Sequence, residues 1–588
     1  MGRSFNFQDL TGGLNTVSSI GTINQSAKRT ESPDMQNVEY FYLGGVKSME
    51  GNIQIGNTLD SEIIGGWDYI QLGHRYIMVA TKKGGVYLFN ESTEVFDKIY
   101  QFSHANATRV SFVNMNDGVV FSNGLDDLVF YQKGRHTLLA GEVTTTADST
   151  AVTGTNTQFE LEVSVGDYIE ITGIEGTYRV EEVTDDTNLV LSEAVPTTVS
   201  GATFYLSEIS ECNATLVNSD DPGVSVPIRG TALQFFKGRL WVGSGSTVYY
   251  SQLGQYNKWD IKYEAGGIGD FYNDTSKVLG LGLFGDYMLI HKERFTYILS
   301  GGNDPNDWSL SPYASITCES QQSWVVTNAK YFIFSRSNMG IYPLTQRTVF
   351  NDKYVGQEIS VKIRDIFNEL RLSDLDKVFA VAHPSKRWML MYMPFASVLG
   401  SSKCVIFDFQ TNSWLIRKLP QEVTIAFTVD NKVYIGTAEG KVLLEFYGKT
   451  FDGEFLDAYW KSPWFALGDD SYYKTFNEFC IQVAEEDNNS FYLRGYRDKQ
   501  SGYTERYITN NFRDVNSLIW DGVTPIDGNE TTWDNNDWVR TSLLDFRFPM
   551  ELNMFENYQI ELRTAELGQG FSCYGFGFRR VEYDEARW

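Results

Sequence analysis

Between residues 61 and 450 the sequence repeats one pattern: an apolar strand, a tight polar turn, a second apolar strand and an aromatic residue. Clear examples are WDYIQLGHRYIMVATKKGGVYLFN (67–90), RVSFVNMNDGVVFSNGLDDLVFYQ (109–132) and TALQFFKGRLWVGSGSTVYYSQ (231–252). Each unit predicts three or four short strands, and an isolated hairpin of this kind cannot bury its apolar faces. Units placed around an axis bury these faces and protect their strand edges. The repeats therefore predict a β-propeller of six or seven blades, with a long array of β-sandwiches as the alternative.

The composition supports an all-β fold. The chain has 588 residues, of which 42% are hydrophobic and 15% aromatic, and it contains 52 Gly. Aromatic and β-branched residues favour strands, and glycine favours the tight turns that join them. A chain of this length is long enough for several domains or for one large repeated architecture.

One segment, residues 141–207, interrupts the repeats. It is rich in Thr and Val and nearly free of Lys and Arg. Ile169 and Ile171 alternate with Glu170 and Thr172, which is typical of a strand with one buried face. Insertions at exposed loops cost little stability, and functional appendages are often carried there. The segment predicts a small β-barrel inserted into a propeller loop.

Beyond residue 450 the repeats end, and NEFCIQVAEEDNNSFYLRGYRD (477–498) reads as a strand pair of a separate β-sandwich-like domain. The acidic, Trp-rich stretch 520–540 predicts a long loop. The sequence thus predicts a β-propeller with an inserted small β-barrel and a C-terminal β-sandwich-like domain. The expected order is an N-terminal docking segment and hairpin (1–60), the first propeller blades (61–140), the inserted barrel (141–207), the remaining blades (208–450) and the C-terminal β-domain (451–588).

The N-terminal stretch ESPDMQNVEYFYLGGVKSMEGN (31–52) predicts two local elements. Ser32-Pro33-Asp34 can open a helical turn, with Ser32 as the cap and Pro33 at the first helical position. Val38–Tyr42 and Val46–Met49 then read as the strands of a hairpin that turns at Gly44-Gly45.

The net charge of −26 argues against ordinary nucleic-acid binding, because that binding depends on basic residues that neutralise phosphates. An acidic wall past which DNA slides without adhering is compatible with this charge. The five cysteines, at 212, 318, 404, 480 and 573, are far apart and form no CxxC motif, which favours reduced core thiols over disulfides or a zinc site. The sequence shows neither a secretory signal nor an apolar run of membrane-spanning length, and we expect a soluble protein without membrane insertion.

The motifs of familiar enzymes are missing. The histidines, at 74, 104, 136, 291 and 383, lie in different repeats without HxxxH or HExxH spacing, and no GxSxG or phosphate-binding glycine loop occurs. The carboxylate pairs 126–127, 220–221 and 469–470 are sequence neighbours, which does not place them across a glycosidic bond. DGNETTWDNNDW (527–538) lacks the spacing of a calcium loop and reads as a solvated acidic loop. We therefore expect no enzyme activity, no catalytic, cofactor-binding or metal-binding residues and no cofactor.

FQDLTGGLNT (7–16) followed by residues 31–52 resembles the N-terminal signature of tail nozzle, or tail hub, proteins of short-tailed bacteriophages, the group of the tail tubular and packaged-DNA stabilisation proteins. The matching residues are Gly12-Gly13-Leu14-Asn15, Ser32-Pro33-Asp34, Gln36-Asn37, Gly44-Gly45 and Gly51-Asn52. The resemblance implies a β-propeller and a C-terminal β-domain in each subunit, and six copies around a channel through which the genome leaves. The Thr-rich insert is similar to small barrels of phage tail proteins. The opening hairpin would start the propeller or dock it to a neighbour.

The leading expectation is a structural virion protein, a homohexameric tail nozzle that retains packaged DNA and conducts it during ejection. It would assemble in the host cytoplasm and reside in the virion tail. Its partners would be the adaptor and portal proteins, tail fibres or spikes, and DNA that passes without specific binding. The alternative is a host-surface-binding or glycan-degrading propeller with an aromatic groove and two carboxylates about 5–10 Å apart. A secreted propeller lectin is a third interpretation.

Overall fold

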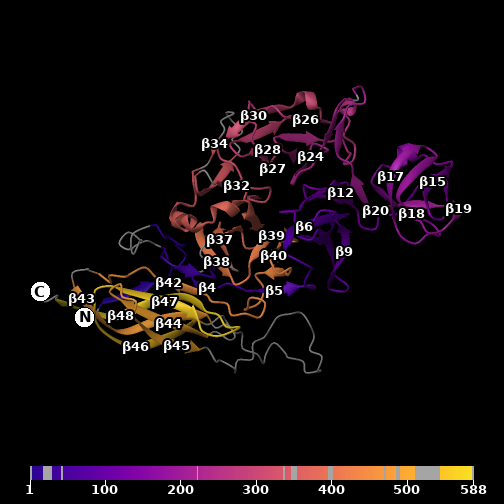
Figure 1. The fold of residues 1–588 in the computed structure, drawn as a ribbon. Helices are drawn as coiled ribbons and strands as arrows, with labels where there is room; N and C mark the ends of the chain where they lie inside the picture. Colours follow the sequence, from indigo (N-terminus) through magenta and orange to yellow (C-terminus); the bar gives the residue numbers. More distant parts are fainter. Residues whose placement is uncertain are drawn as a thin grey trace, which may run out of the picture.

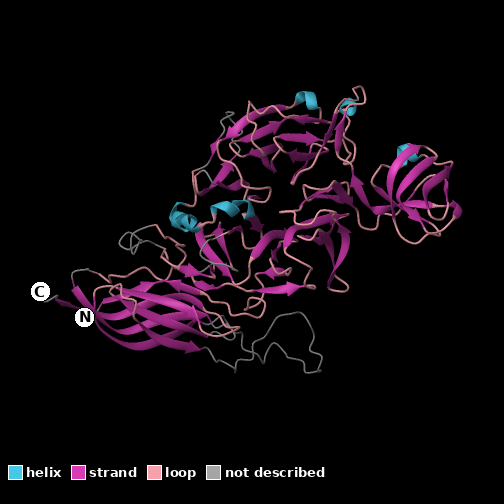
Figure 2. Cartoon of the chain, viewed as in Figure 1, coloured by secondary structure: helices cyan, strands magenta, loops and turns pink. Residues whose placement is uncertain are grey.

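The computed structural model describes residues 3–17, 29–41, 44–221, 223–335, 338–345, 354–355, 357–394, 401–468, 472–484, 490–509 and 543–585. Nearly all of its regular structure is β, which confirms the predicted fold class (Figures 1 and 2). None of the helices in these ranges is long and apolar enough to span a membrane. The predicted acidic loop 520–540, the stretch 527–538 and the pair Asp469-Asp470 lie outside the described residues.

In the described ranges, seven antiparallel units of four strands form the propeller (Figure 1), and the N-terminal strand β5 supplies the fourth strand of the last unit. The blades are, in order: blade 1, β6 (Ile63–Gln71), β7 (His74–Thr81), β8 (Gly85–Asn90) and β9 (Val95–Gln101); blade 2, β10 (Ser111–Met115), β11 (Gly118–Ser122), β12 (Leu128–Tyr131) and β20 (Phe204–Cys212); blade 3, β23 (Ala232–Phe236), β24 (Arg239–Ser244), β25 (Thr247–Tyr250) and β26 (Gly266–Ile268); blade 4, β27 (Val278–Phe284), β28 (Tyr287–Lys292), β29 (Thr296–Ser300) and β30 (Ser309–Ala314); blade 5, β31 (Trp324–Thr327), β32 (Lys330–Ser335), β33 (Gly340–Thr345) and β34 (Tyr354–Val355); blade 6, β35 (Phe379–His383), β36 (Trp388–Met393), β37 (Ser402–Asp408) and β38 (Ser413–Leu419); and blade 7, β39 (Val423–Val429), β40 (Lys432–Thr437), β41 (Val442–Glu445) and β5 (Asn52–Ile55).

Local turn chemistry explains the hairpins within the blades. Asn116 and Asp117, between β10 and β11, both have positive φ angles, as do Lys237 and Gly238 between β23 and β24. These angles match the right-handed twist of the strands that they join. The first strand of each blade lies innermost, and β6 contacts both β10 and β39. The ring therefore closes between blade 7 and blade 1.

Short elements connect the blades. The strands β21 (Thr215–Val217) and β22 (Ser225–Pro227) form a hairpin between blades 2 and 3. The 3₁₀ helices η1 (Ile261–Tyr263) and η2 (Pro305–Asp307) lie within blades 3 and 4 in chain order, and η3 (Val361–Glu369) and η4 (Leu372–Lys377) lead from blade 5 to blade 6.

The insert projects from blade 2 as the small β-barrel that the sequence predicts (Figure 1). Phe159, Ile169 and Phe204 belong to its own apolar core. The strand β20 is shared, because its beginning pairs with the insert and its end pairs with β12 of blade 2. The elements are β13 (Thr137–Leu138), β14 (Glu142–Thr145), β15 (Ser149–Thr155), α1 (Phe159–Glu162), β16 (Asp167–Ile171), β17 (Tyr178–Asp185), β18 (Asn188–Val195) and β19 (Val199–Ala202).

The C-terminal domain is a sandwich of two sheets, and N-terminal strands complete both of them. One sheet has the order β3-β4-β48-β43-β46, with β1 also paired to β48, and the other has the order β2-β42-β47-β44-β45. Aromatic rings fill the space between them, among them Phe7, Phe465 and Phe576. The strands are β1 (Arg3–Phe7), β2 (Met35–Gln36), β3 (Val38–Tyr40), β4 (Val46–Ser48), β42 (Tyr459–Lys461), β43 (Tyr472–Ala484), β44 (Ser490–Arg497), β45 (Tyr503–Thr509), β46 (Leu543–Phe555), β47 (Tyr558–Thr564) and β48 (Ser572–Glu585).

Two expectations for the N-terminal stretch need correction. The predicted helical turn at Ser32-Pro33-Asp34 is wrong, because Ser32 forms a β-bridge with Leu14 and the chain continues into β2. The Ser32 hydroxyl donates to the carbonyl of Asp34 instead of accepting from a helical N–H. The predicted hairpin exists as β3 and β4, but β4 pairs with β48, so the hairpin extends the sandwich and does not start the propeller.

Candidate functional site

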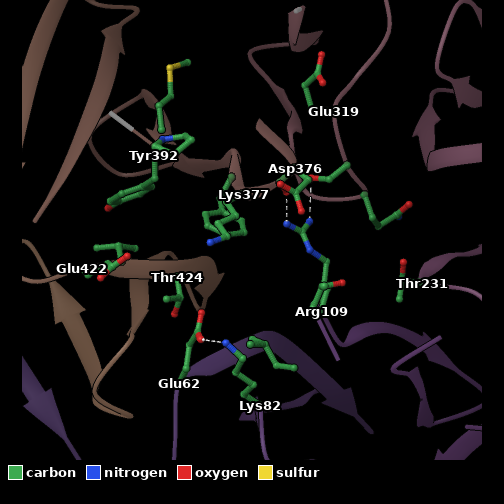
Figure 3. Close-up of a pocket in the computed structure, with 18 of the residues that line it drawn as sticks. Glu62, Lys82, Arg109, Thr231, Glu319, Asp376, Lys377, Tyr392, Glu422 and Thr424 are labelled. Carbon is green, nitrogen blue, oxygen red and sulfur yellow. Dashed lines mark hydrogen bonds and ion pairs between the residues drawn. The ribbon is translucent and has the colours of Figure 1, made fainter. Parts of the chain in front are cut away.

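One end of the propeller axis forms a cavity of about 380 Å³ (Figure 3). Successive inner strands run in the same direction, so the residues that precede them gather at this end. The cavity, called the axial mouth below, is lined by residues from all seven blades, among them Glu62, Arg109, Thr231, Leu279, Ser320, Asp376 and Glu422.

Arg109 crosses the axial mouth. It precedes β10 in blade 2, and its guanidinium donates from Nη1 to the Ser320 hydroxyl (2.8 Å) and from Nη2 to the Asp376 carbonyl (2.5 Å). These two acceptors precede blades 5 and 6, which lie opposite blade 2 in the ring. The guanidinium also packs over the ring of Phe379 at 5.1 Å. Burial lowers the pKa of Arg109 to about 10, so the side chain that closes the axis is still charged at neutral pH.

Gln321 seals the axis from another side. Its amide nitrogen donates to the carbonyls of Leu233 (3.0 Å) and Leu281 (2.9 Å), and its amide oxygen accepts from the N–H of Leu281 (2.7 Å). These backbone groups belong to the inner strands of blades 3 and 4. The inner strand is the edge strand of its blade, so its backbone N–H and C=O groups that face the axis need hydrogen-bond partners. Gln321 supplies them from the segment that leads into blade 5.

Side chains also bond to the backbone of inner strands between other pairs of blades. Polar side chains donate to carbonyls of the adjacent inner strand: Asn114 to Asp68 (2.9 Å), Thr424 to Ile63 (2.6 Å) and Thr428 to Ala382 (2.9 Å). With Arg109 and Gln321 they fill much of the axis with protein atoms. The axis of one propeller is therefore far too narrow for a DNA duplex.

The charges at the axial mouth are balanced. The described lining residues include four acidic side chains (Glu62, Glu319, Asp376, Glu422) and four basic ones (Lys82, Arg109, Arg371, Lys377). Glu62 and Lys82 form an ion pair at 2.7 Å (Figure 3). The acidic excess of the chain is therefore located elsewhere.

A second feature, called the seam below, joins the propeller to the sandwich and contains the N-terminal signature. The backbone of the signature bonds to β38, the outer strand of blade 6. The N–H of Leu14 donates to the carbonyl of Trp414, and the N–H of Asn37 donates to the carbonyl of Ile416. The Asn37 side chain accepts from the N–H of Lys418 (2.8 Å) and donates to the carbonyls of Lys418 (3.0 Å) and Asp457 (2.9 Å). Asn37 has a φ of 54°, a conformation that favours asparagine over most residues.

The end of the signature closes the ring of blades. Asn52 begins β5 and donates to a carboxylate oxygen of Glu445 at 2.8 Å. The other Glu445 oxygen accepts from Arg417 Nε at 2.7 Å, and both of these charged side chains are fully buried. Arg417 also donates to the carbonyls of Glu50 (2.7 Å) and Gly51 (2.9 Å). A Cβ at Gly51 would lie 1.8 Å from the Thr450 carbonyl oxygen, so this approach requires glycine.

The structure does not bring the five histidines together. His291 is buried between Thr296 and Tyr331, and burial lowers its pKa to about 3. Burial also lowers the pKa of His383, to about 4. The remaining three lie on other elements, His74 at the start of β7, His104 against Asp126 and His136 against Glu170. Within the described ranges no three His, Cys, Asp or Glu side chains are close enough to hold a metal ion.

The adjacent carboxylates also have separate partners. Asp126 contacts His104, Asp127 pairs with Arg229 at 3.2 Å, and Asp220 pairs with Lys262 at 3.1 Å. The cysteines, as their spacing predicts, are all buried and free. Burial raises the pKa of the thiols of Cys212, Cys318, Cys404 and Cys573, which keeps them protonated.

No family of known sequences and no curated protein matches the chain. Among solved structures, the computationally designed Ika8 protein is similar at 12% identity with a TM-score of 0.34, covering 68% of this chain and 99% of the designed one. A chain of the mitotic checkpoint complex is similar at 10% identity with a TM-score of 0.31, covering 68% of this chain and 95% of that one. Similarity this weak carries no information about function.

Proposed function

We propose that this chain is a structural subunit of a short phage tail: a nozzle that assembles as a homohexamer, retains packaged DNA and conducts it during ejection. The observation that carries the proposal is the role of the signature in the seam. Asn37 and Gly51 occupy places where backbone geometry and hydrogen bonds require their residue types. The resemblance to tail nozzle proteins therefore rests on residues that hold the architecture together.

The closed axis supports a channel between subunits. Because Arg109 and Gln321 block the axis of one propeller, a DNA path needs walls from several copies. Interfaces that hold such a ring are expected to be broad and to use Tyr, Trp and Phe, which supply contact area at little entropic cost. The proposed partners are the adaptor and portal proteins above the ring, tail fibres or spikes at its side, and DNA in its lumen.

The insert supplies much of the acidic character. Residues 141–207 contain twelve Asp and Glu but one Arg, a net charge of −11 out of the −26 of the whole chain. The barrel projects from the propeller, so this charge lies on an arm rather than at the axial mouth (Figure 1). We place such acidic surface along the DNA path, where it would keep phosphates from adhering.

Mass photometry tests the proposal. The purified chain of 66.8 kDa is measured alone and mixed with the adaptor–portal complex of its virion. A species of about 400 kDa, or saturation at six copies per portal ring, is the expected result. A stable monomer or trimer that ignores the portal would refute the nozzle. It would direct attention to the alternative, a propeller that binds or cleaves host-surface glycans.

A further inference from the structure

The insert and blade 2 share one hydrogen-bonded sheet. The strand β20 joins them, because it pairs with β12 of blade 2 on one side and with β16 of the insert on the other. Both pairings meet at Ser210, which lies between Phe130 of blade 2 and Asp167 of the insert. The twist between neighbouring strands varies by roughly 10–35° among sheets, so β20 alone would let the insert rotate about this strand.

Glu211 is an anchor on one face of β20 that opposes this rotation. Its carboxylate accepts from the hydroxyl of Tyr100 (2.8 Å), the hydroxyl of Tyr168 (2.9 Å) and Nε of Arg179 (2.6 Å). Tyr100 lies on β9, the outer strand of blade 1, whereas Tyr168 and Arg179 lie on β16 and β17 of the insert. One carboxylate on a strand of blade 2 therefore ties the insert to blade 1 as well.

The chemistry of the Glu211 anchor makes it strong. Burial and the adjacent carboxylate raise the pKa of Tyr100 and of Tyr168, so both hydroxyls remain donors at neutral pH. The side chains of Arg179 and Glu211 are 23% and 19% exposed, which shields their ion pair from much of the solvent. Hydrogen bonds to a charged acceptor are about twice as strong as those between neutral groups. The anchor therefore resists separation of its parts.

The opposite face of β20 carries a second attachment. Successive side chains of a strand point to opposite faces, so Ser210 lies on the face away from Glu211. The Ser210 hydroxyl donates to Asp167 of the insert and accepts from Nη2 of Arg135 at 3.0 Å. Nη1 of Arg135 donates to the Tyr256 hydroxyl at 3.4 Å. Because Tyr256 lies between β25 and β26, this chain of bonds leads from the insert to blade 3.

A direct bond also joins the insert to blade 3. Nδ2 of Asn257 donates to the Ser164 hydroxyl of the insert at 3.2 Å. Bonds on both faces of β20 thus lead to blades 1 and 3, on either side of blade 2, and a rotation about β20 would stretch them. We propose that the insert is a rigid arm, held in one orientation relative to the propeller by the Glu211 anchor and the bonds behind it.

A rigid arm changes what the insert can do. Ordering a mobile surface costs entropy on binding, and a surface that is already fixed avoids this cost. Residues 141–207 carry a net charge of −11, and the arm would hold this acidic surface at one place relative to the propeller. The inference concerns the orientation of the arm within one chain, so it does not depend on the proposed hexamer.

Distances between two spin labels in the full chain, measured by pulsed electron paramagnetic resonance, test the proposal. The labels are attached through Ser192→Cys on β18 of the insert and Ser309→Cys on β30 of blade 4, because both serines are exposed whereas the five native cysteines are buried. Dilution with unlabelled chain makes the measured distance intramolecular whether or not copies assemble. We expect a single narrow distribution of distances. A broad distribution, or one with several peaks, would overturn the proposal.

Variants of the anchor test its part in holding the arm. Glu211→Ala removes all three bonds and should broaden the distribution. The double variant Tyr100→Phe/Tyr168→Phe keeps both rings but removes two of the donors to Glu211, and it should broaden the distribution as well. Glu182→Ala is the matched control, because Glu182 is exposed on β17 of the insert, and it should leave the distribution unchanged.

Thermal melting verifies that each variant is folded, and the double variant decides the outcome if Glu211→Ala does not fold. A distribution as narrow as that of the wild type in every folded variant of the anchor would overturn the role of Glu211.

Discussion

Arg417→Met removes one partner of the buried ion pair in the seam. The guanidinium holds Glu445 at 2.7 Å and two carbonyls, Glu50 and Gly51, and it packs over the ring of Phe446 at 4.5 Å. Methionine fills much of the same apolar space but donates no hydrogen bond. The substitution therefore leaves the Glu445 carboxylate, which is fully buried, without its cation.

The expected loss of stability follows from this burial. Removing one member of a buried ion pair costs about 3–5 kcal/mol, because the remaining charge stays desolvated. Asn52 still donates to Glu445 at 2.8 Å, which places the loss towards the lower end. For an all-β unit as large as this propeller, the loss corresponds to a fall in melting temperature of roughly 3–10 °C.

Differential scanning calorimetry at a fixed scan rate measures this fall, with Arg417→Met compared to Arg417→Met/Glu445→Gln. The double variant replaces the orphaned carboxylate with a neutral amide that can still accept from Asn52, so it should recover at least half of the loss. A single variant that melts within about 1 °C of the wild type would refute the reasoning. So would a double variant that is no more stable than the single one.

Three further changes test other parts of the structure. Gly51→Ala should destabilise the chain by about 1–3 kcal/mol, because the new Cβ would lie 1.8 Å from the Thr450 carbonyl oxygen. The control Gly502→Ala has free space around the new Cβ and should leave the melting temperature unchanged. Burial lowers the pKa of His291 to about 3 in the fold, whereas the side chain of an unfolded histidine binds a proton below about pH 6.5. The free energy of unfolding should therefore fall by up to about 4 kcal/mol as the pH drops from about 6.5 to 3. Melting curves of His291→Gln should show a smaller fall over the same pH range. Arg109→Met should lower the free energy of unfolding by about 1–3 kcal/mol, because it removes the donors to Ser320 and Asp376. Amide hydrogen exchange of residues 319–323 should then accelerate. Unchanged exchange in these residues would contradict a closing role for Arg109.

The parts of the fold that the sequence predicts are those set by local chemistry. Asn116-Asp117-Gly118 and Lys237-Gly238 form hairpin turns because their residues tolerate positive φ angles, so the repeats could be read in order. Ser32-Pro33-Asp34 carries an equally local signal for a helical turn, but in the structure Ser32 forms a β-bridge. There the bridge to Leu14 outweighs the capping preference.

The long-range parts had no comparable signal. The four residues of β5 lie almost 400 positions from β41 in the sequence, and nothing in Asn52–Ile55 indicates this pairing. Arg109, which precedes β10, and Arg417, inside β38, were missed because a charged residue usually indicates a surface position. Arg109 is buried because blades 5 and 6, across the ring, supply its acceptors. Arg417 is buried because the neighbouring blade 7 and the segment before β5 supply its acceptors, which only the closed propeller brings together.

The seam also changes how residues 1–60 are understood. The described strands of this segment belong to its two neighbours, because β1–β4 complete the sandwich and β5 completes blade 7. Neither unit is therefore complete without the same N-terminal segment, in which Asn37 bonds to Lys418 of blade 6 and to Asp457 before β42, and Glu50 and Gly51 accept from Arg417. In a proposed nozzle that must hold packaged DNA, a rigid joint of this kind would carry force between the two ends of each subunit. The stretch 31–52 has no catalytic pattern, and its Asn37, Gly51 and Asn52 are residues that this joint uses.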